Sequence, residues 1–351
     1  MDLKQPSSAL PEPKPGEHPF APYVRILGKG KRGSRSLTFD EARHAMALIL
    51  RGEVEDVQLG AFLMLLRVKE ETPEELAGFV QAVRDQAQAP ASLQVDLDWS
   101  SYAGKRRHNP WFLFSILLLA EHGLRVFVHG AEGHTPERIY LSEAMADFGF
   151  RTAESWDEVK SQLDSQGFSY LPLARFAKPL AEMIDLRPIM GLRSPVHSLA
   201  RLINPLGART VLQGIFHPPY APMHQQAGLL LGYQHLAVIR GEGGEIERNP
   251  DNALKVFQAT LAEDGVGEGR LAEVTWPALF ERRHVKPETI GMEAMRRVWR
   301  GEEQDSYGEA ATVSTAALAL LETGHADSQE DAMALAQRLW DGRDKTRFAA
   351  P

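Results

Sequence analysis

The chain has 351 residues, a formal net charge of −8 and no cysteine, which excludes disulfide bonds, a thiolate nucleophile and a cysteine zinc site. A chain of this length can bury a large core in two domains or in one large α/β unit. No apolar run approaches the roughly 20 residues that cross a bilayer, and the polar, proline-rich residues 1–21 are predicted to be a flexible segment, not a signal peptide. A cytoplasmic protein without a membrane partner is expected, and the histidines show no spacing typical of metal ligands.

The first organised region, up to about residue 90, is predicted to hold three short helices. Thr38 and Glu41 form a capping box at the start of the first helix, and residues 59–66 carry the apolar face of the second. Thr72 and the proline and glutamates that follow it start the third helix. These signals predict a compact helical domain.

After Pro90 the pattern changes to strand-like runs that alternate with helical periodicity, which is typical of a mostly parallel sheet in an α/β domain. Strands are predicted at residues 124–128, 210–215 and 236–239. Helices are predicted at residues 111–121, 176–192, 194–203 and 221–231, and again in the tail at 288–340.

A run of cations follows the strand that precedes the helix at 111–121: Lys105, Arg106 and Arg107. A helix start exposes unpaired N–H groups and the positive end of the helix dipole, so cations placed there concentrate positive potential in one loop. The junction predicts a site for an anion, most simply a phosphate. Pairing of these cations with local acids such as Asp96 and Asp98 is the alternative interpretation.

Four motifs carry a resemblance to a known family: residues 60–78, His129-Gly130, Leu192-Arg193 and Asn204-Pro205. They resemble the anthranilate phosphoribosyltransferases of the third glycosyltransferase family, whose fold is shared with the pyrimidine nucleoside phosphorylases. The resemblance implies a small helical domain (residues 22–90 with 176–206) and a larger α/β domain (residues 91–175 with 207–351). It also implies a homodimer formed through the N-terminal helical domain.

The catalytic motifs of this family are altered in the chain. The family's glycine-rich loop GTGGD, which holds phosphoribosyl pyrophosphate, aligns with residues 103–107, where only Gly104 remains. The KHGNR motif aligns with residues 128–132 and retains His129 and Gly130. The magnesium motif DGLDE aligns with residues 243–247, where Glu247 is retained but Ile246, which offers no oxygen ligand, replaces an aspartate. Glu245 is expected to point elsewhere if this segment is extended.

These departures resemble the YbiB-type paralogues of the family, which implies a protein that binds nucleic acid without anthranilate phosphoribosyltransferase activity. Binding of DNA or RNA is predicted through the phosphate backbone and without sequence specificity. The predicted contacts are Lys105, Arg106, Arg107 and Arg201 in one groove, with added contributions from Lys29, Lys31, Arg32 and Arg35. A solvated linker at residues 29–35 and a surface position without a role at Arg201 are the alternatives.

Two other functions fit the same residues. An active phosphoribosyltransferase would use the substrate-like pocket of Gly104, His129, Gly130, Arg187 and Arg193, with Mg²⁺ on Glu247. A regulatory protein would instead bind an acidic partner protein through its basic loops. The favoured prediction is a protein that binds nucleic acid and uses no cofactor, because cations replace the enzyme's glycines.

Overall fold

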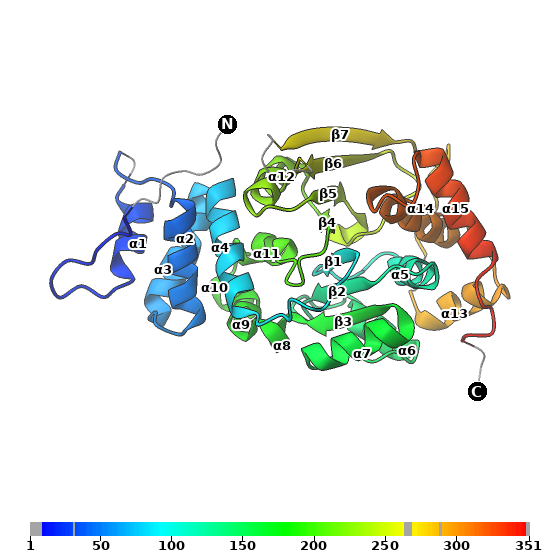
Figure 1. Cartoon of the computed structure of the whole chain (residues 1–351), viewed down its shortest axis with the longest axis horizontal. Helices are drawn as coiled ribbons and strands as arrows, with labels where there is room; N and C mark the ends of the chain where they lie inside the picture. The colour runs from blue at the N-terminus through cyan, green and yellow to red at the C-terminus, as the bar shows by residue number, and fades with distance from the viewer. Residues whose placement is uncertain (1–8, 31, 263–268, 288–289, 349–351) are drawn as a thin grey trace.

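The N-terminal helices form one end of the molecule in this computed structural model, which describes residues 9–30, 32–262, 269–287 and 290–348 (Figure 1). They are α1 (Ala21–Gly28), α2 (Phe39–Leu50), α3 (Asp56–Lys69) and α4 (Pro73–Gln86). The capping boxes of Thr38 and Thr72 are confirmed, and α1 is a helix beyond the three that were predicted. Residues 1–8 lie outside the described residues, but Phe20 is fully buried against Tyr23, so the end of the segment expected to be flexible is held in the core.

A second set of short helices packs against this bundle. They are α8 (Leu173–Phe176), α9 (Lys178–Asp185), α10 (Arg187–Met190), α11 (Val196–Leu199) and the 3-10 turn η1 (Ala200–Leu202). The two longer helices predicted for this region are broken, because prolines start α9, α10 and α11 and Gly191 ends α10 at a φ of +73°. Helix α9 contacts α2, and α11 contacts α4.

The α/β part is built on a seven-stranded sheet with the order β3-β2-β1-β4-β5-β6-β7. The strands are β1 (Leu97–Ser101), β2 (Val126–Gly130), β3 (Phe168–Pro172), β4 (Thr210–Ile215), β5 (His235–Arg240), β6 (Leu254–Thr260) and β7 (Arg270–Trp276). Strands β1 to β5 are parallel, and β6 and β7 extend the sheet antiparallel. The mostly parallel sheet is confirmed.

Strand order reverses between β1 and β4, so the loops that follow these two strands flank a crevice at the carboxyl ends of the parallel strands. This is where ligands bind in open α/β sheets. The cationic loop of residues 102–111 follows β1 and therefore lies at this point.

Helices cover both faces of the sheet. They are α5 (Phe112–Glu121), α6 (Leu141–Asp147), α7 (Trp156–Gln166), α12 (Ala221–Leu230), α13 (Met292–Arg300), α14 (Ser306–Glu322) and α15 (Gln329–Asp341), with 3-10 turns η2 (Pro218–Tyr220) and η3 (Glu242–Gly244). Helix α5 is apolar around its circumference because it is buried beneath α14 and α15. Within the described residues, none of the helices combines the length and apolar character that crossing a bilayer requires.

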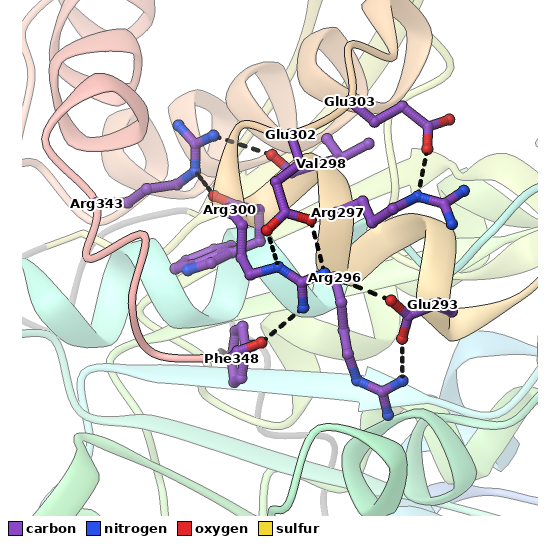
Figure 2. A network of polar contacts seen from close by, with 10 residues as sticks. Glu293, Arg296, Arg297, Val298, Arg300, Glu302, Glu303, Arg343 and Phe348 are labelled. Carbon is purple, nitrogen blue, oxygen red and sulfur yellow. Dashed lines mark hydrogen bonds and ion pairs between the residues drawn. The ribbon is translucent and has the colours of Figure 1, made fainter. Parts of the chain in front are cut away.

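Ion pairs and carbonyl contacts fasten the C-terminal segment to α13 (Figure 2). The guanidinium of Arg343 lies 3.6 Å from the ring centre of Trp340 and donates to the carbonyls of Val298 and Trp299. Arg300 donates to the Phe348 carbonyl at 2.8 Å and pairs with Glu302. These contacts hold the segment after α15 against α13.

Candidate functional site: a neutralised phosphate loop beside a basic groove

The backbone of the loop after β1 binds a carboxylate of the same chain. The N–H groups of Ala103 and Gly104 each donate to one oxygen of Glu245, at 2.6 Å in both cases. Gly104 has a φ of +67°, which favours glycine, and Glu245 is fully buried. The backbone donors expected to hold a phosphate are therefore occupied by the side chain of Glu245.

Lys105 is buried rather than exposed, with 1% of its surface accessible. Its Nζ lies 2.5 Å from Oε1 of Glu247, whose other oxygen accepts the N–H of Phe112 at 2.9 Å. Burial raises the pKa of Glu247 to about 7, against the opposing effect of the ammonium. Lys105 was expected to contact nucleic acid, but its side chain is buried inside the protein. A buried carboxylate requires a partner, and the ammonium of Lys105 provides it.

These residues do not fit Mg²⁺. The carboxylate of Glu247 is paired with an ammonium, and Ile246 is buried and offers no oxygen. Among the described residues, no group of three acidic, histidine or cysteine side chains is placed to hold a metal ion.

Arg106 and Arg107, the next two residues, are exposed and line an open cavity of about 810 Å³, which we call the basic groove. Its fully or partly exposed cations are Arg106, Arg107, Arg138, Arg240, Lys255, Arg283 and Lys286, and its carboxylates are Glu242 and Asp251. The buried Lys105 also borders the groove, but its charge is paired with Glu247. Arg106 pairs with Glu137 at 2.7 Å, and Lys255 pairs with Glu273 at 2.7 Å. Both pairs are exposed, so water and salt screen them and a polyanion can replace either acid.

Arg138 braces the loop that forms one wall of the groove. Its Nη1 donates to the carbonyls of Ala103 at 2.7 Å and Gly104 at 3.1 Å. The sequence did not predict Arg138, Arg240, Lys255, Arg283 and Lys286 as groove residues. The one sequence signal for a groove residue was the position of Arg240. It follows a predicted strand directly, at the same edge of the sheet as the loop after β1.

His129 and Gly130 have structural partners. The ring of His129 is fully buried between the Tyr102 hydroxyl, 2.7 Å from Nδ1, and Asp98, 3.2 Å from Nε2. A Cβ on Gly130 would lie 1.9 Å from the carbonyl oxygen of Ser101. The glycine is therefore required by the close approach of β1 and β2.

The remaining arginines of the substrate-like pocket lie in a separate place. Arg187 donates to the Thr135 hydroxyl at 3.0 Å, while Arg193 and Arg201 line a smaller cavity of about 140 Å³. Arg201 donates to the carbonyls of His197 and Gly214 and lies 5.8 Å from the ring centre of Tyr102. Arg201 is thus not a wall of the basic groove, contrary to the expectation of one shared groove.

Two histidines lie among these arginines. The ring centres of His134 and His197 are 5.7 Å apart. Burial, together with the nearby guanidinium groups of Arg193 and Arg201, lowers the pKa of His134 to about 4 and that of His197 to about 3. Both rings are therefore neutral near pH 7.

The cations between α1 and α2 lie far from the basic groove. Lys29 and Arg32 are exposed, and Arg35 pairs with Glu41 at 2.6 Å. Lys31 lies outside the described residues. Helix α1 is at the left end of Figure 1, whereas α5, which follows the cationic loop, lies among the sheet and the C-terminal helices.

The fold and the first helices relate the chain to known proteins. Residues 22–87 match the helical bundle domain of the glycosyl transferase family. The chain is 29% identical over 242 residues to the uncharacterized protein YbiB of Escherichia coli, covering 68% of this chain and 75% of that one. It is 25% identical over 265 residues to an anthranilate phosphoribosyltransferase of Geobacillus thermodenitrificans, covering 71% and 76%.

A solved structure shows the same fold. The anthranilate phosphoribosyltransferase TrpD of Thermus thermophilus superposes with a TM-score of 0.71 at 22% identity, covering 91% of this chain and 94% of that one. The architecture is therefore that of a phosphoribosyltransferase-like scaffold with the helical bundle of the glycosyl transferase family. Together with the altered motifs, these similarities confirm the predicted resemblance to a YbiB-type, TrpD-like paralogue.

Proposed function

We propose that this protein binds nucleic acid through the phosphate backbone, without sequence specificity, and does not transfer a phosphoribosyl group to anthranilate. The observation that carries the proposal is the basic groove, whose cations outnumber its carboxylates in a chain with a net charge of −8. A local excess of positive charge on an acidic protein attracts a polyanion to one surface.

The contacts of the loop after β1 support the proposal that the protein does not transfer a phosphoribosyl group. Glu245 occupies the backbone N–H groups of the loop, and Lys105 occupies the carboxylate that would hold a metal. A pyrophosphate with its magnesium would have to displace a buried carboxylate and a buried ammonium, each of which would then lack its partner.

A salt titration tests the binding. Fluorescence anisotropy with labelled single-stranded and double-stranded DNA and with RNA should show an affinity that falls steeply with salt and depends little on base sequence. Replacing Arg240, Arg283 and Lys286 by alanine should lower the slope of log affinity against log salt by about 0.7–0.9 for each phosphate that the variant no longer neutralises.

A variant that removes the same charge elsewhere is the control. Lys160, Arg175 and Lys178 are exposed cations on other elements, none of them in the wall of the groove, and their replacement by alanine should leave the slope near that of the unmodified protein. Equal losses in both variants, or no binding by the unmodified protein, would remove the groove from the proposal. Competition by heparin but not by an acidic folded protein would separate nucleic acid from a protein partner.

An activity assay tests whether the protein transfers a phosphoribosyl group to anthranilate. With phosphoribosyl pyrophosphate, anthranilate and magnesium, we expect no turnover, and restoring glycines in the loop alone should not rescue it because Ile246 still leaves the metal short of a ligand. The persistence of Arg187, Arg193 and Glu247 favours the second candidate, an active phosphoribosyltransferase, and robust turnover would establish it.

We further propose a homodimer formed through the helical domain. Val57 and Val68 on α3 are large apolar side chains with 78% and 83% of their surface exposed. Burying them against a second copy would remove apolar surface from water. Light scattering should give a dimer mass that Val68→Asp reduces, and a monomeric unmodified protein would contradict this.

A further inference from the structure

Three polar side chains from separate segments form a continuous hydrogen-bonded chain beside the basic groove. Asp251 precedes β6, His284 lies in the segment after β7, and Ser306 is the first residue of α14. Oδ1 of Asp251 is 2.7 Å from Nδ1 of His284, and Nε2 of His284 is 3.0 Å from Oγ of Ser306. We propose that these residues are the acid, base and nucleophile of a serine esterase centre, an activity separate from nucleic-acid binding.

The contacts of Asp251 define the tautomer of the imidazole. One carboxylate oxygen accepts from Nδ1 of His284, and the other accepts the backbone N–H of the same residue at 2.9 Å. The side chain of Asp251 is only 7% exposed, so its charge is held close to the ring. With the proton on Nδ1, the lone pair of Nε2 points at the Ser306 hydroxyl, as a general base requires.

The ring of His284 is also held sterically. The ring centre of Phe280 is 4.5 Å from it at an angle of 82°, and the ring centre of Tyr307 is 5.7 Å away. About a quarter of the histidine side chain remains exposed, and it lines the basic groove together with Asp251, so the base is fixed in place and open to solvent on that side. A base that is already oriented loses little freedom at the moment of reaction.

A cavity of about 430 Å³ adjoins the serine. Its apolar wall includes Phe280, Val313 and Met333, and Asp305 and Glu309 contribute carboxylates. The apolar wall fits the acyl part of an ester, and the acids disfavour an anionic substrate. The substrate class is therefore a neutral or cationic carboxylic ester.

Donors for the developing oxyanion are present at the start of α14. The carboxylate of Asp305 caps the N–H of Gly308 at 2.7 Å, whereas the N–H groups of Ser306 and Tyr307 have no acceptor among the described residues. The first N–H groups of a helix lack partners within the helix and carry the positive end of its dipole. A carbonyl oxygen that accepted from these two N–H groups would have its developing negative charge stabilised by them.

The reaction is balanced without any further cofactor. The Ser306 oxygen attacks the ester carbonyl while Nε2 of His284 takes the hydroxyl proton. The bond to the leaving alkoxide then breaks, and that oxygen receives the proton from His284. Water attacks the acyl-serine with the histidine again as base, and the acid and the free serine are released.

The test uses the full-length protein and two probes. A fluorophosphonate should label it at Ser306, located by peptide mass spectrometry, and p-nitrophenyl acetate should be hydrolysed. Ser306→Ala should abolish both the labelling and the hydrolysis, and His284→Gln should slow both by about 100-fold or more. Asp251→Asn should also slow both reactions. The control Ser161→Ala removes an exposed hydroxyl on α7 and should change neither.

The outcomes distinguish an esterase centre from a hydrogen-bond network with a purely structural role. No labelling at Ser306 in the unmodified protein, or labelling at an unchanged rate in a folded His284→Gln variant, would overturn the proposal and leave the three residues as a clamp between loops. Because labelling of the unmodified protein needs no variant, loss of folding in a variant cannot obscure the result. Nucleic-acid binding measured on Ser306→Ala should be unchanged, so this proposal and the proposed function fail independently.

Discussion

Lys105 and Arg106 are neighbours in the chain, yet the first is 1% exposed and the second has a side chain that is 63% exposed. The first neutralises a buried carboxylate within the protein, and the second pairs with an acid at the surface that any polyanion could replace. A run of cations is therefore not one functional unit. Lys105, the inner cation, stabilises the fold at the place where the related enzymes are expected to bind a phosphate. Arg106 and Arg107, the outer cations, are available to a partner.

Removing the inner cation should have the largest effect. Lys105→Met leaves the carboxylate of Glu247 buried without its partner, so the free energy of unfolding should fall by about 3–5 kcal/mol in urea titrations. The double variant Lys105→Met with Glu247→Gln removes both charges and should recover most of this loss. Arg106→Met, which breaks an exposed pair, should change stability by less than about 1 kcal/mol. Equal losses from the two single variants would contradict the comparison.

Acidification should next destabilise the region where His134 and His197 lie beside Arg193 and Arg201. His134 and His197 have pKa values of about 4 and about 3, whereas an unfolded histidine titrates near its ordinary value of 6.5. As the pH falls from 6.5 to about 4, the unfolded chain binds protons that the folded chain does not, so stability decreases through this window. Each of the two histidines should contribute at most about 3 kcal/mol to this decrease. The variant His134→Gln with His197→Gln should show a shallower pH dependence, and an unchanged dependence would exclude these two groups.

Removing the outer cations should change binding rather than stability. Arg106→Ala with Arg107→Ala should lower the salt slope of DNA affinity by about 0.7–0.9 for each phosphate left without its cation. The stable double variant of Lys105 and Glu247 should keep the slope of the unmodified protein, because the two charges neutralise each other and neither side chain is more than 1% exposed. A slope that changes in the Lys105 and Glu247 variant but not in the arginine variant would reverse the roles of the inner and outer cations.

The smallest effect is expected for the cations between α1 and α2. Lys29→Ala with Arg32→Ala removes two exposed charges that lie in another part of the molecule (Figure 1). Long-range attraction over more than a Debye length, about 10 Å at 0.1 M salt, is largely screened. The salt slope should therefore change by less than in the variant of Arg106 and Arg107, and an equal change in anisotropy titrations would extend the binding surface to this loop.

The sequence by itself determined the features that depend on neighbouring residues. The capping boxes of Thr38 and Thr72 join groups three positions apart, and the strand at residues 210–215 follows from a local apolar run; all three are confirmed. The motif at residues 60–78 likewise predicted the helical bundle that the family comparison confirms. Such signals can be seen in one stretch of chain, because the interacting groups are separated by one or two helical turns.

The tertiary structure alone decided which cations are buried and which side chains meet. Lys105 pairs with a glutamate 142 positions away, and Ser306 meets a histidine 22 positions before it and, through that ring, Asp251. The basic groove likewise combines Arg106 and Arg107 with Arg240 and Arg283 from distant segments. The charge of a residue is known from its sequence, but its electrostatic role depends on burial and on partners, and both are determined by the packing of the sheet, helices and loops.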